Sequence, residues 1–281
     1  MSKQLIVPID HSQDSWRAFE VALALADRSD RGVHLVHVAP GPLDGQQAEV
    51  EIDLELQRRG PFDVEVTVEV RLSIDTVASE LEAALQLQPD AITVMASHGK
   101  GRSAAIIGSV TEDMLQRTFG PIVLVGPNVE PNDFTGPVIV TVDGSEESEA
   151  ALPLAGVWAT KLMTTPWIIN VADPRAAGPG DADVLETAYL ARLTKRLGAA
   201  SDRAVQFDEL HDRHPDRAIA EYAAAHDASL VVVSSHGRSG LSRLAVGSIA
   251  ASVVRRATCP VVVIRLPHPA HADSREHMWA Y

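Results

Sequence analysis

Two glycine-containing stretches of the chain have residue types and a spacing that could bind phosphate. ASHGKGRSAAIIGS covers residues 96–109, and SSHGRSGLSRLAVGS covers residues 234–248. Each follows a run of apolar, β-forming residues and ends on a Gly-Ser pair. A glycine after a strand lets the backbone turn with positive φ and lets a ligand come close. A helix that starts at the Gly-Ser pair would point free N–H groups and its positive dipole end at an anion.

The glycines and serines of these stretches are therefore candidate phosphate-binding residues. Each serine is expected to cap the following helix, and SVTE at 109–112 has the spacing of a capping box. A divalent cation would help to hold a polyphosphate, because the chain as a whole is acidic. The same pattern also fits an ordinary turn and helix start. The candidates are Gly99, Gly108, Ser109 and Val110 in the first stretch, and Gly237, Arg238, Gly247, Ser248 and Ile249 in the second.

An aspartate follows the first apolar strand of each half. Asp10 ends LIVPID, and Asp143 ends VIVTVD. Such a carboxylate could accept a hydrogen bond from the base or ribose of a nucleotide, or it could form an Asx-turn or helix cap. His98 and His236 open the two glycine loops, and we interpret them as turn residues that pack near the loop rather than as catalytic groups.

Several motifs of nucleotide-handling enzymes are missing. The Walker A pattern is absent, and GKGRSA at 99–104 only imitates a dinucleotide-binding fingerprint. The acidic residue that this fingerprint needs at the end of the next strand is missing from PIVLVGPN at 121–128. The sequence has no nucleophile elbow, paired-carboxylate motif or Cys/His metal spacing. We therefore predict no catalytic and no metal-ligating residue, and a dinucleotide dehydrogenase is not favoured.

Alternating strands and helices must position these residues. Most of the predicted strands are nearly continuous apolar runs, typical of a parallel sheet covered on both faces, whereas the third alternates and is half exposed. Between them, DTVASELEAALQL and DRAIAEYAAAHDA have helical periodicity. The aspartates and glycine loops would meet at one edge of the sheet if the first and fourth strands were neighbours. The strands of the first half are predicted near 4–9, 33–39, 64–70, 91–96 and 122–126.

The chain is a tandem repeat, because the same segments recur in the same order. LIVPIDHS matches VIVTVDGS, and TFGPIVLV matches TCPVVVIR. The predicted fold class is α/β, with two tandem doubly wound, five-stranded parallel-sheet domains of the Rossmann-like type. The predicted domains are 1–127 and 137–266, joined by a linker at 126–137 and followed by a disordered tail at 267–281.

The composition limits the binding partners and the cellular compartment that can be expected for this protein. The chain has 281 residues, a net charge of −14 and a single cysteine, Cys259. An acidic surface argues against nucleic acid as a partner. No apolar run is long enough to span a membrane, and the N-terminal apolar run is too short for a signal peptide. A single cysteine excludes an internal disulfide, so we expect a cytoplasmic protein.

These features resemble the universal stress protein family in its tandem-domain form, over nearly all of residues 3–266. ATP-binding members carry G-x2-G-x9-G-[S/T]. The second repeat keeps this spacing after Gly237 but has Ser234 at the first glycine. The first repeat has Ala96 there and lacks one loop residue, which should shift its helix start. The second repeat is therefore the better predicted ATP site.

The resemblance implies roles for the matching residues. Asp10 and Asp143 would meet the adenosine, and the backbone of Val38 and Val171 would meet adenine. The glycines, Ser109 and Ser248 match the phosphate-binding positions. The family members dimerise through the last strand, so PVVVIRL at 260–266 should pair with PIVLV at 121–125, in a homodimer or inside one chain.

The function that the resemblance implies is an ATP-binding, stress-response regulator that is non-catalytic or at most a slow ATPase, with ATP and Mg²⁺ as its ligands. One alternative is a nucleotide-free dimerisation or interaction scaffold. Another is an adenylate-handling enzyme, such as an adenylate-forming enzyme or an ATP pyrophosphatase. These enzymes need an H-x-G-H or S-G-G-x-D-S signature, and the sequence has neither.

Overall fold

The computed structural model describes residues 3–88, 90–99, 107–118, 120–175, 182–235 and 247–265. The first repeat consists of β1 (Gln4–Pro8), α1 (Gln13–Ser29), β2 (Gly32–Ala39), α2 (Pro42–Arg59), β3 (Val66–Leu72), α3 (Val77–Gln86), β4 (Ile92–Ala96), α4 (Ser109–Arg117) and β5 (Gly120–Val125). The predicted strands are confirmed, although β3 begins two residues later than expected. The predicted tail at 267–281 lies outside the described residues.

The second repeat follows the same order, with one short extra helix. It consists of β6 (Val138–Val142), α5 (Glu146–Glu149), α6 (Leu152–Leu162), β7 (Pro166–Ala172), α7 (Ala182–Ser201), β8 (Gln206–His211), α8 (Pro215–Ala225), β9 (Leu230–Ser234), α9 (Ser248–Arg256) and β10 (Val261–Arg265).

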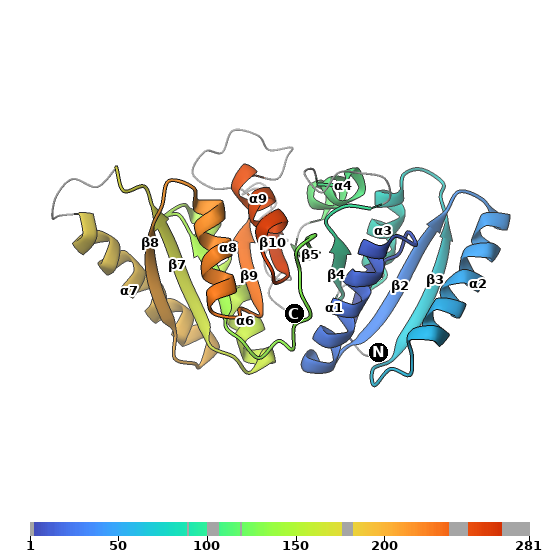
Figure 1. Ribbon diagram of the computed structural model, residues 1–281, viewed down its shortest axis with the longest axis horizontal. Coiled ribbons are helices and arrows are strands. Elements are labelled where there is room, and N and C mark those ends of the chain that lie inside the picture. The colour runs from blue at the N-terminus through green and yellow to red at the C-terminus, as the bar shows by residue number, and fades with distance from the viewer. Residues whose placement is uncertain are drawn as a thin grey trace.

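Within the described residues, ten strands join one sheet in the order β3-β2-β1-β4-β5-β10-β9-β6-β7-β8. Within each repeat the neighbouring strands are parallel, and β1 lies beside β4 as the predicted site requires. At the centre, β5 and β10 pair in antiparallel orientation, with Val123 opposite Val262. The predicted pairing of the two last strands therefore occurs inside one chain, as a pseudo-dimer (Figure 1).

Helices cover both faces of the sheet. Side chains of α1, α2, α6 and α7 pack on one face, and those of α3, α4, α8 and α9 pack on the other. The helices α4 and α9 lie on the same face of the sheet. In Figure 1 they are seen to the right and to the left of the central β5–β10 pair. Of the two central strands, β5 is fully buried and β10 is buried up to its last residue, because both of their faces are covered. The edge strand β3 is only partly buried, as its alternating sequence predicted.

The linker between the repeats packs against the second repeat. Phe134 is completely buried, and its backbone has a positive φ of 55°. The side-chain amide of Asn128 donates to the carbonyl of Arg255 (2.8 Å), and the N–H of Glu130 donates to the carbonyl of Thr258 (2.9 Å). These contacts fasten the linker along the end of α9. Among the described helices, none is both long and apolar enough to cross a membrane.

Candidate functional site

A cavity of about 260 Å³ lies at the carboxyl ends of β1, β2 and β4, between α3 and α4. Strand order reverses here, between β1 and β4, and doubly wound sheets bind their ligands at such a point. We call this cavity the first-repeat pocket. Its lining includes the residues that the sequence suggested for the first repeat: Asp10, Val38, Gly99, Gly108, Ser109 and Val110.

Asp10 both caps its own turn and contacts the glycine loop. Its Oδ1 accepts a hydrogen bond from the N–H of Ser12 (3.0 Å), which is the Asx-turn that the sequence allowed. Its other carboxylate oxygen lies against Gly99, where a Cβ atom would come within 2.4 Å of Oδ2. The turn therefore fixes one oxygen of Asp10 and leaves the other at the pocket, so a structural role and a binding role are compatible.

Asp143 has the same local geometry in the second repeat. Its Oδ1 accepts from the N–H (3.0 Å) and from the hydroxyl (2.6 Å) of Ser145. Its own N–H donates to Ser148 Oγ at 3.2 Å, just as the N–H of Asp10 donates to Ser15 Oγ at 3.4 Å. The two aspartates are thus held in equivalent turns.

The backbone of Val38 faces the pocket. The N–H of Ile9 donates to the carbonyl of Val36 (2.9 Å), and the N–H of Ser73 donates to the carbonyl of Ala39 (2.8 Å). Because successive carbonyls of a strand point to opposite sides, the carbonyl of Val38 points to the β1 side. β1 ends at Pro8, so this carbonyl is directed into the space beyond the strand.

The second glycine of each loop closes the loop onto the preceding strand. The N–H of Gly108 donates to the carbonyl of Ser97 at 2.8 Å, and the N–H of Gly247 donates to the carbonyl of Ser235 at 2.8 Å. A Cβ atom on Gly247 would lie 2.9 Å from that carbonyl oxygen. The same bond forms in both repeats, so each helix starts from an equivalent contact with the residue that follows its strand. The expected shift was relative to the first glycine of the loop, and in the second repeat that glycine, Gly237, lies outside the described residues.

The prediction that serine caps each of these helices was wrong. The N-caps are Gly108 and Gly247, and neither helix has a side-chain cap. The helices begin one residue earlier than expected because each glycine closes onto its strand, which places Ser109 and Ser248 inside the first turn. The first N–H groups of a helix have no partner within the helix. In α4 these belong to Ser109 and Val110, which line the pocket.

His98 is a buried packing residue at the start of the loop, as interpreted from the sequence. Only 7% of it is exposed, although it lines the pocket. Its Nδ1 lies 2.9 Å from Ser97 Oγ, and its Nε2 lies 3.7 Å from Asp14 Oδ2. These contacts hold the ring between β4 and the start of α1.

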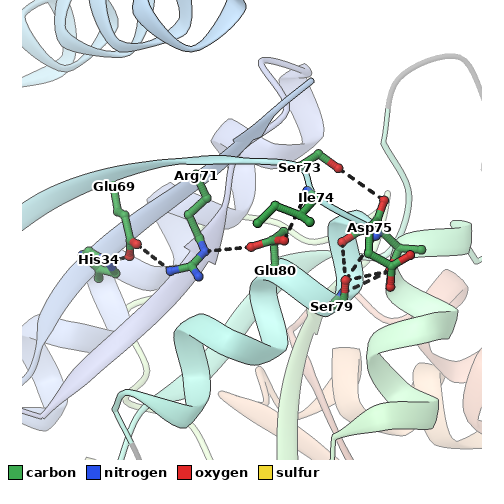
Figure 2. A network of polar contacts seen from close by, with 9 residues as sticks. His34, Glu69, Arg71, Ser73, Ile74, Asp75, Ser79 and Glu80 are labelled. Carbon is green, nitrogen blue, oxygen red and sulfur yellow. Dashed lines mark hydrogen bonds and ion pairs between the residues drawn. The ribbon is translucent and has the colours of Figure 1, made fainter. Parts of the chain in front are cut away.

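A network of charged side chains, which sequence reasoning missed, supports one wall of the pocket (Figure 2). His34 Nε2 lies 3.1 Å from Glu69 Oε2, and Arg71 donates to Glu69 (2.6 Å) and to Glu80 (3.4 Å). Glu80 in turn accepts from the N–H of Ile74 (3.4 Å), before α3. The network therefore ties β2 and β3 to the helix that carries two lining residues, Val77 and Leu81.

The network also changes the acidity of Glu69. Burial alone would raise the pKa of this carboxyl group, but hydrogen bonds from His34 and Arg71 outweigh burial and lower the pKa below 4.5. The alternation of valine with polar and charged residues in VEVTVEVR was the signal that could have indicated such a network.

The second repeat has aromatic residues at the equivalent place. The position of His34 is taken by Trp167, whose ring packs against those of Tyr222 and His226.

The candidate site of the second repeat is described only in part. Asp143, Val171, Gly247, Ser248 and Ile249 are described, and Val171 lies near the end of β7 as predicted. Ile249 is half-exposed. Gly237 and Arg238 lie outside the described residues, as does His236. Among the residues that are described, no cluster of three or more His, Cys, Asp or Glu could hold a metal ion.

The fold and the pocket define a tandem, doubly wound α/β protein with a ligand-sized cavity at the switch point of its first repeat. Residues 1–126 and 135–265 both match the model of the Universal stress protein family. The chain therefore belongs to the universal stress protein family.

Individual proteins are similar to this chain. A universal stress protein of Mycolicibacterium smegmatis is 30% identical over 289 residues, which cover 93% of this chain and 96% of that protein. One of Mycobacterium tuberculosis is 30% identical over 191 residues, covering 63% of this chain and 59% of that protein. The crystal structure of a universal stress protein from Archaeoglobus fulgidus DSM 4304 has a TM-score of 0.72 at 20% identity, covers 95% of this chain and 100% of that chain, and shows the same fold.

Proposed function

We propose that this chain is a regulatory, non-catalytic stress-response protein of the cytoplasm that binds ATP, with Mg²⁺, in one or both repeats. The observation that carries the proposal is the first-repeat pocket, because residues from four separate segments of the chain converge on it: Asp10, Val38, Gly99 and Gly108. The structure brings these positions together from elements far apart in the sequence.

The chemistry of the lining fits a nucleotide. Val36, Leu81 and Met95 supply an apolar slot for a base. The carbonyl of Val38 can accept a hydrogen bond from the amino group of adenine, and Asp10 can accept one from a ribose hydroxyl. The N–H groups at the start of α4 are directed toward the loop, where they would donate to phosphate oxygens.

The second repeat is the tighter of the two proposed sites. Its loop keeps the nine-residue spacing between Gly237 and Gly247 that ATP-binding members of the family have. Its aspartate, Asp143, is held as Asp10 is held. We therefore expect ATP in the second repeat first, and weaker binding in the first.

The test is to denature the purified protein and to quantify the released nucleotides per chain by anion-exchange chromatography. One ATP per chain that disappears in Gly237→Glu, with an unchanged unfolding midpoint, supports the second repeat as the site. An additional ATP that remains in Gly237→Glu locates binding in the first repeat as well. If no nucleotide is released and none binds when ATP and Mg²⁺ are titrated back, the proposal fails and a nucleotide-free scaffold is the better description.

A further inference from the structure

Helix α2 covers the outer end of the sheet, beside the edge strand β3. Its inward face, with Gly45, Ala48 and Ile52, is buried. A Cβ atom on Gly45 would contact the side chains of Val70 and Leu72, so this face packs on β3. In Figure 1, α2 lies at the right-hand end of the molecule, and no other described element lies beyond it. The opposite side of the helix therefore faces solvent.

The solvent side of α2 is apolar as well. Leu43, Val50 and Leu54 are 81%, 59% and 59% exposed. Together with the exposed Gln47, they occupy positions i, i+4, i+7 and i+11, which is the spacing of the a and d positions in a heptad repeat. Single exposed leucines are common on protein surfaces, but aliphatic residues in heptad register along one helix are the pattern on which a second helix packs. We call these four residues the α2 seam.

The corresponding helix of the second repeat, α7, has no such seam in residues 188–199, where its side chains are described. The leucines in this range, Leu190, Leu193 and Leu197, are all buried. The side chains that α7 exposes include Arg192 and Arg196. Because the second repeat builds the same helix without outward leucines, the fold itself does not require the α2 seam. The seam therefore calls for an explanation outside the fold.

Acidic side chains flank the α2 seam. In the heptad that the seam defines, Asp44 and Glu51 occupy e positions and Asp53 occupies a g position, and all three are exposed. Arg58, at the next e position, already forms an ion pair with Glu55. A helix that packs on the seam would therefore meet mainly negative charge along both of its sides.

A second copy of this chain fits the seam less well than another protein does. Two α2 seams packed on each other would bring their acidic flanks together, and like charges across an interface are costly. The seam is also short, because residues 43–54 of a helix span about 17 Å. A stable dimer buries about 1,200–2,000 Å² in total, and a seam of this length is suited instead to a weaker, reversible contact. The anionic head groups of a lipid surface would meet the same acidic flanks.

We propose that the α2 seam docks an amphipathic helix of another protein, one with apolar residues at heptad spacing and Lys or Arg on both sides of them. The apolar residues of that helix would pack between Leu43, Val50 and Leu54, as knobs fit into holes. Its basic side chains would pair with Asp53 and Glu51 at the flanks. This contact goes beyond the proposed ATP binding and does not depend on it.

The test uses the full-length protein and a fluorescent synthetic peptide of three heptads, with leucine at a and d and lysine at e and g. We expect the peptide to bind with a Kd of about 1–100 μM in an anisotropy titration. A second peptide with glutamate at e and g should bind at least about tenfold more weakly. The proposal is overturned if the lysine peptide does not bind in this range, or if the glutamate peptide binds equally well.

Variants of the protein locate the docking. Val50→Gln combined with Leu54→Gln should weaken binding of the lysine peptide at least about tenfold. The unfolding midpoint should not change, because both side chains are already exposed and glutamine is a good helix former. The matched control is Leu87→Gln, which changes another leucine that is 74% exposed and should leave the affinity as it is. Binding that survives the double variant would mean that the peptide lies elsewhere, and the proposal would fail.

A charge reversal and the oligomeric state complete the test. Asp53→Lys should weaken binding of the lysine peptide and strengthen binding of the glutamate peptide, whereas equal changes for both peptides would contradict the role of the flanks. In sedimentation velocity we expect the parent protein to be a monomer. A dimer that the double variant dissociates would assign the seam to a second copy of this chain. Vesicles of phosphatidylcholine and phosphatidylglycerol that bind the parent but not the double variant would assign it to a lipid surface, and either result overturns the proposal.

Discussion

Asp10 and Gly99 touch so closely that a Cβ atom at position 99 would lie 2.4 Å from Asp10 Oδ2. An alanine at this position must therefore displace the carboxylate, and this would disturb the hydrogen bond that Asp10 Oδ1 accepts from the N–H of Ser12. We predict that Gly99→Ala lowers the ATP affinity of the first repeat at least about tenfold. Calorimetric titration in a Gly237→Glu background, where the second site is disabled, would measure it.

Gly45→Ala is the matched control for this substitution. A Cβ atom on Gly45 would meet its nearest neighbour, a methyl group of Val70, at 3.4 Å, which is an ordinary contact. Gly45 lies inside α2, where alanine is favoured over glycine by up to about 1 kcal/mol. This variant should bind ATP as the parent does and be at least as stable. Equal ATP affinities of Gly99→Ala, Gly45→Ala and the parent would show that the contact with Asp10 does not shape the site.

The charge of Asp143 should matter more for binding than for folding. In Asp143→Asn, the amide oxygen can still accept from the N–H of Ser145, so the turn persists. Hydrogen bonds to charged groups contribute about 1.5–3 kcal/mol, so we predict that loss of the carboxylate weakens ATP binding in the second repeat about tenfold or more. Thermal unfolding and ATP titration of the same sample would separate the two effects. A lower unfolding midpoint with unchanged ATP affinity would instead assign Asp143 a purely structural role.

The sequence predicted the fold closely because the strands are short apolar runs between clear turn signals, and because each half repeats the other. It also located the pocket, since residues at the carboxyl ends of parallel strands must meet at one edge of the sheet. It misassigned the caps of α4 and α9, because the bond from Gly108 to Ser97 depends on how the loop folds back.

The only cysteine should be chemically inert in the folded protein. Cys259 is 3% exposed, and burial raises the pKa of its thiol to about 12. The thiolate is the reactive form, so at pH 8 the folded chain should react hardly at all with an aromatic disulfide reagent. In denaturant, one thiol per chain should react at once. Rapid reaction of the native protein would show that β10 opens readily, and would contradict the close packing of the central strands.

Arg71 should stabilise the wall of the first-repeat pocket. Arg71→Met removes the donor that joins Glu69 to Glu80 and leaves two partly buried carboxylates side by side. We predict a loss of about 1–3 kcal/mol in the free energy of unfolding at neutral pH. Chemical denaturation would measure the loss. Arg58→Met is the control, because Arg58 is 73% exposed and its ion pair with Glu55 should contribute almost nothing.

The pH dependence of this loss distinguishes an electrostatic role from simple packing. The pKa of Glu69 is lower in the folded protein than its ordinary value of 4.5. A carboxyl group of this kind stabilises the fold fully above its unfolded pKa, and the stabilisation disappears as the pH falls through the folded pKa. The difference in stability between the parent and Arg71→Met should therefore be largest near neutral pH and shrink below pH 4.5. A difference that stays constant down to pH 3 would mean that Arg71 acts through its aliphatic contacts alone.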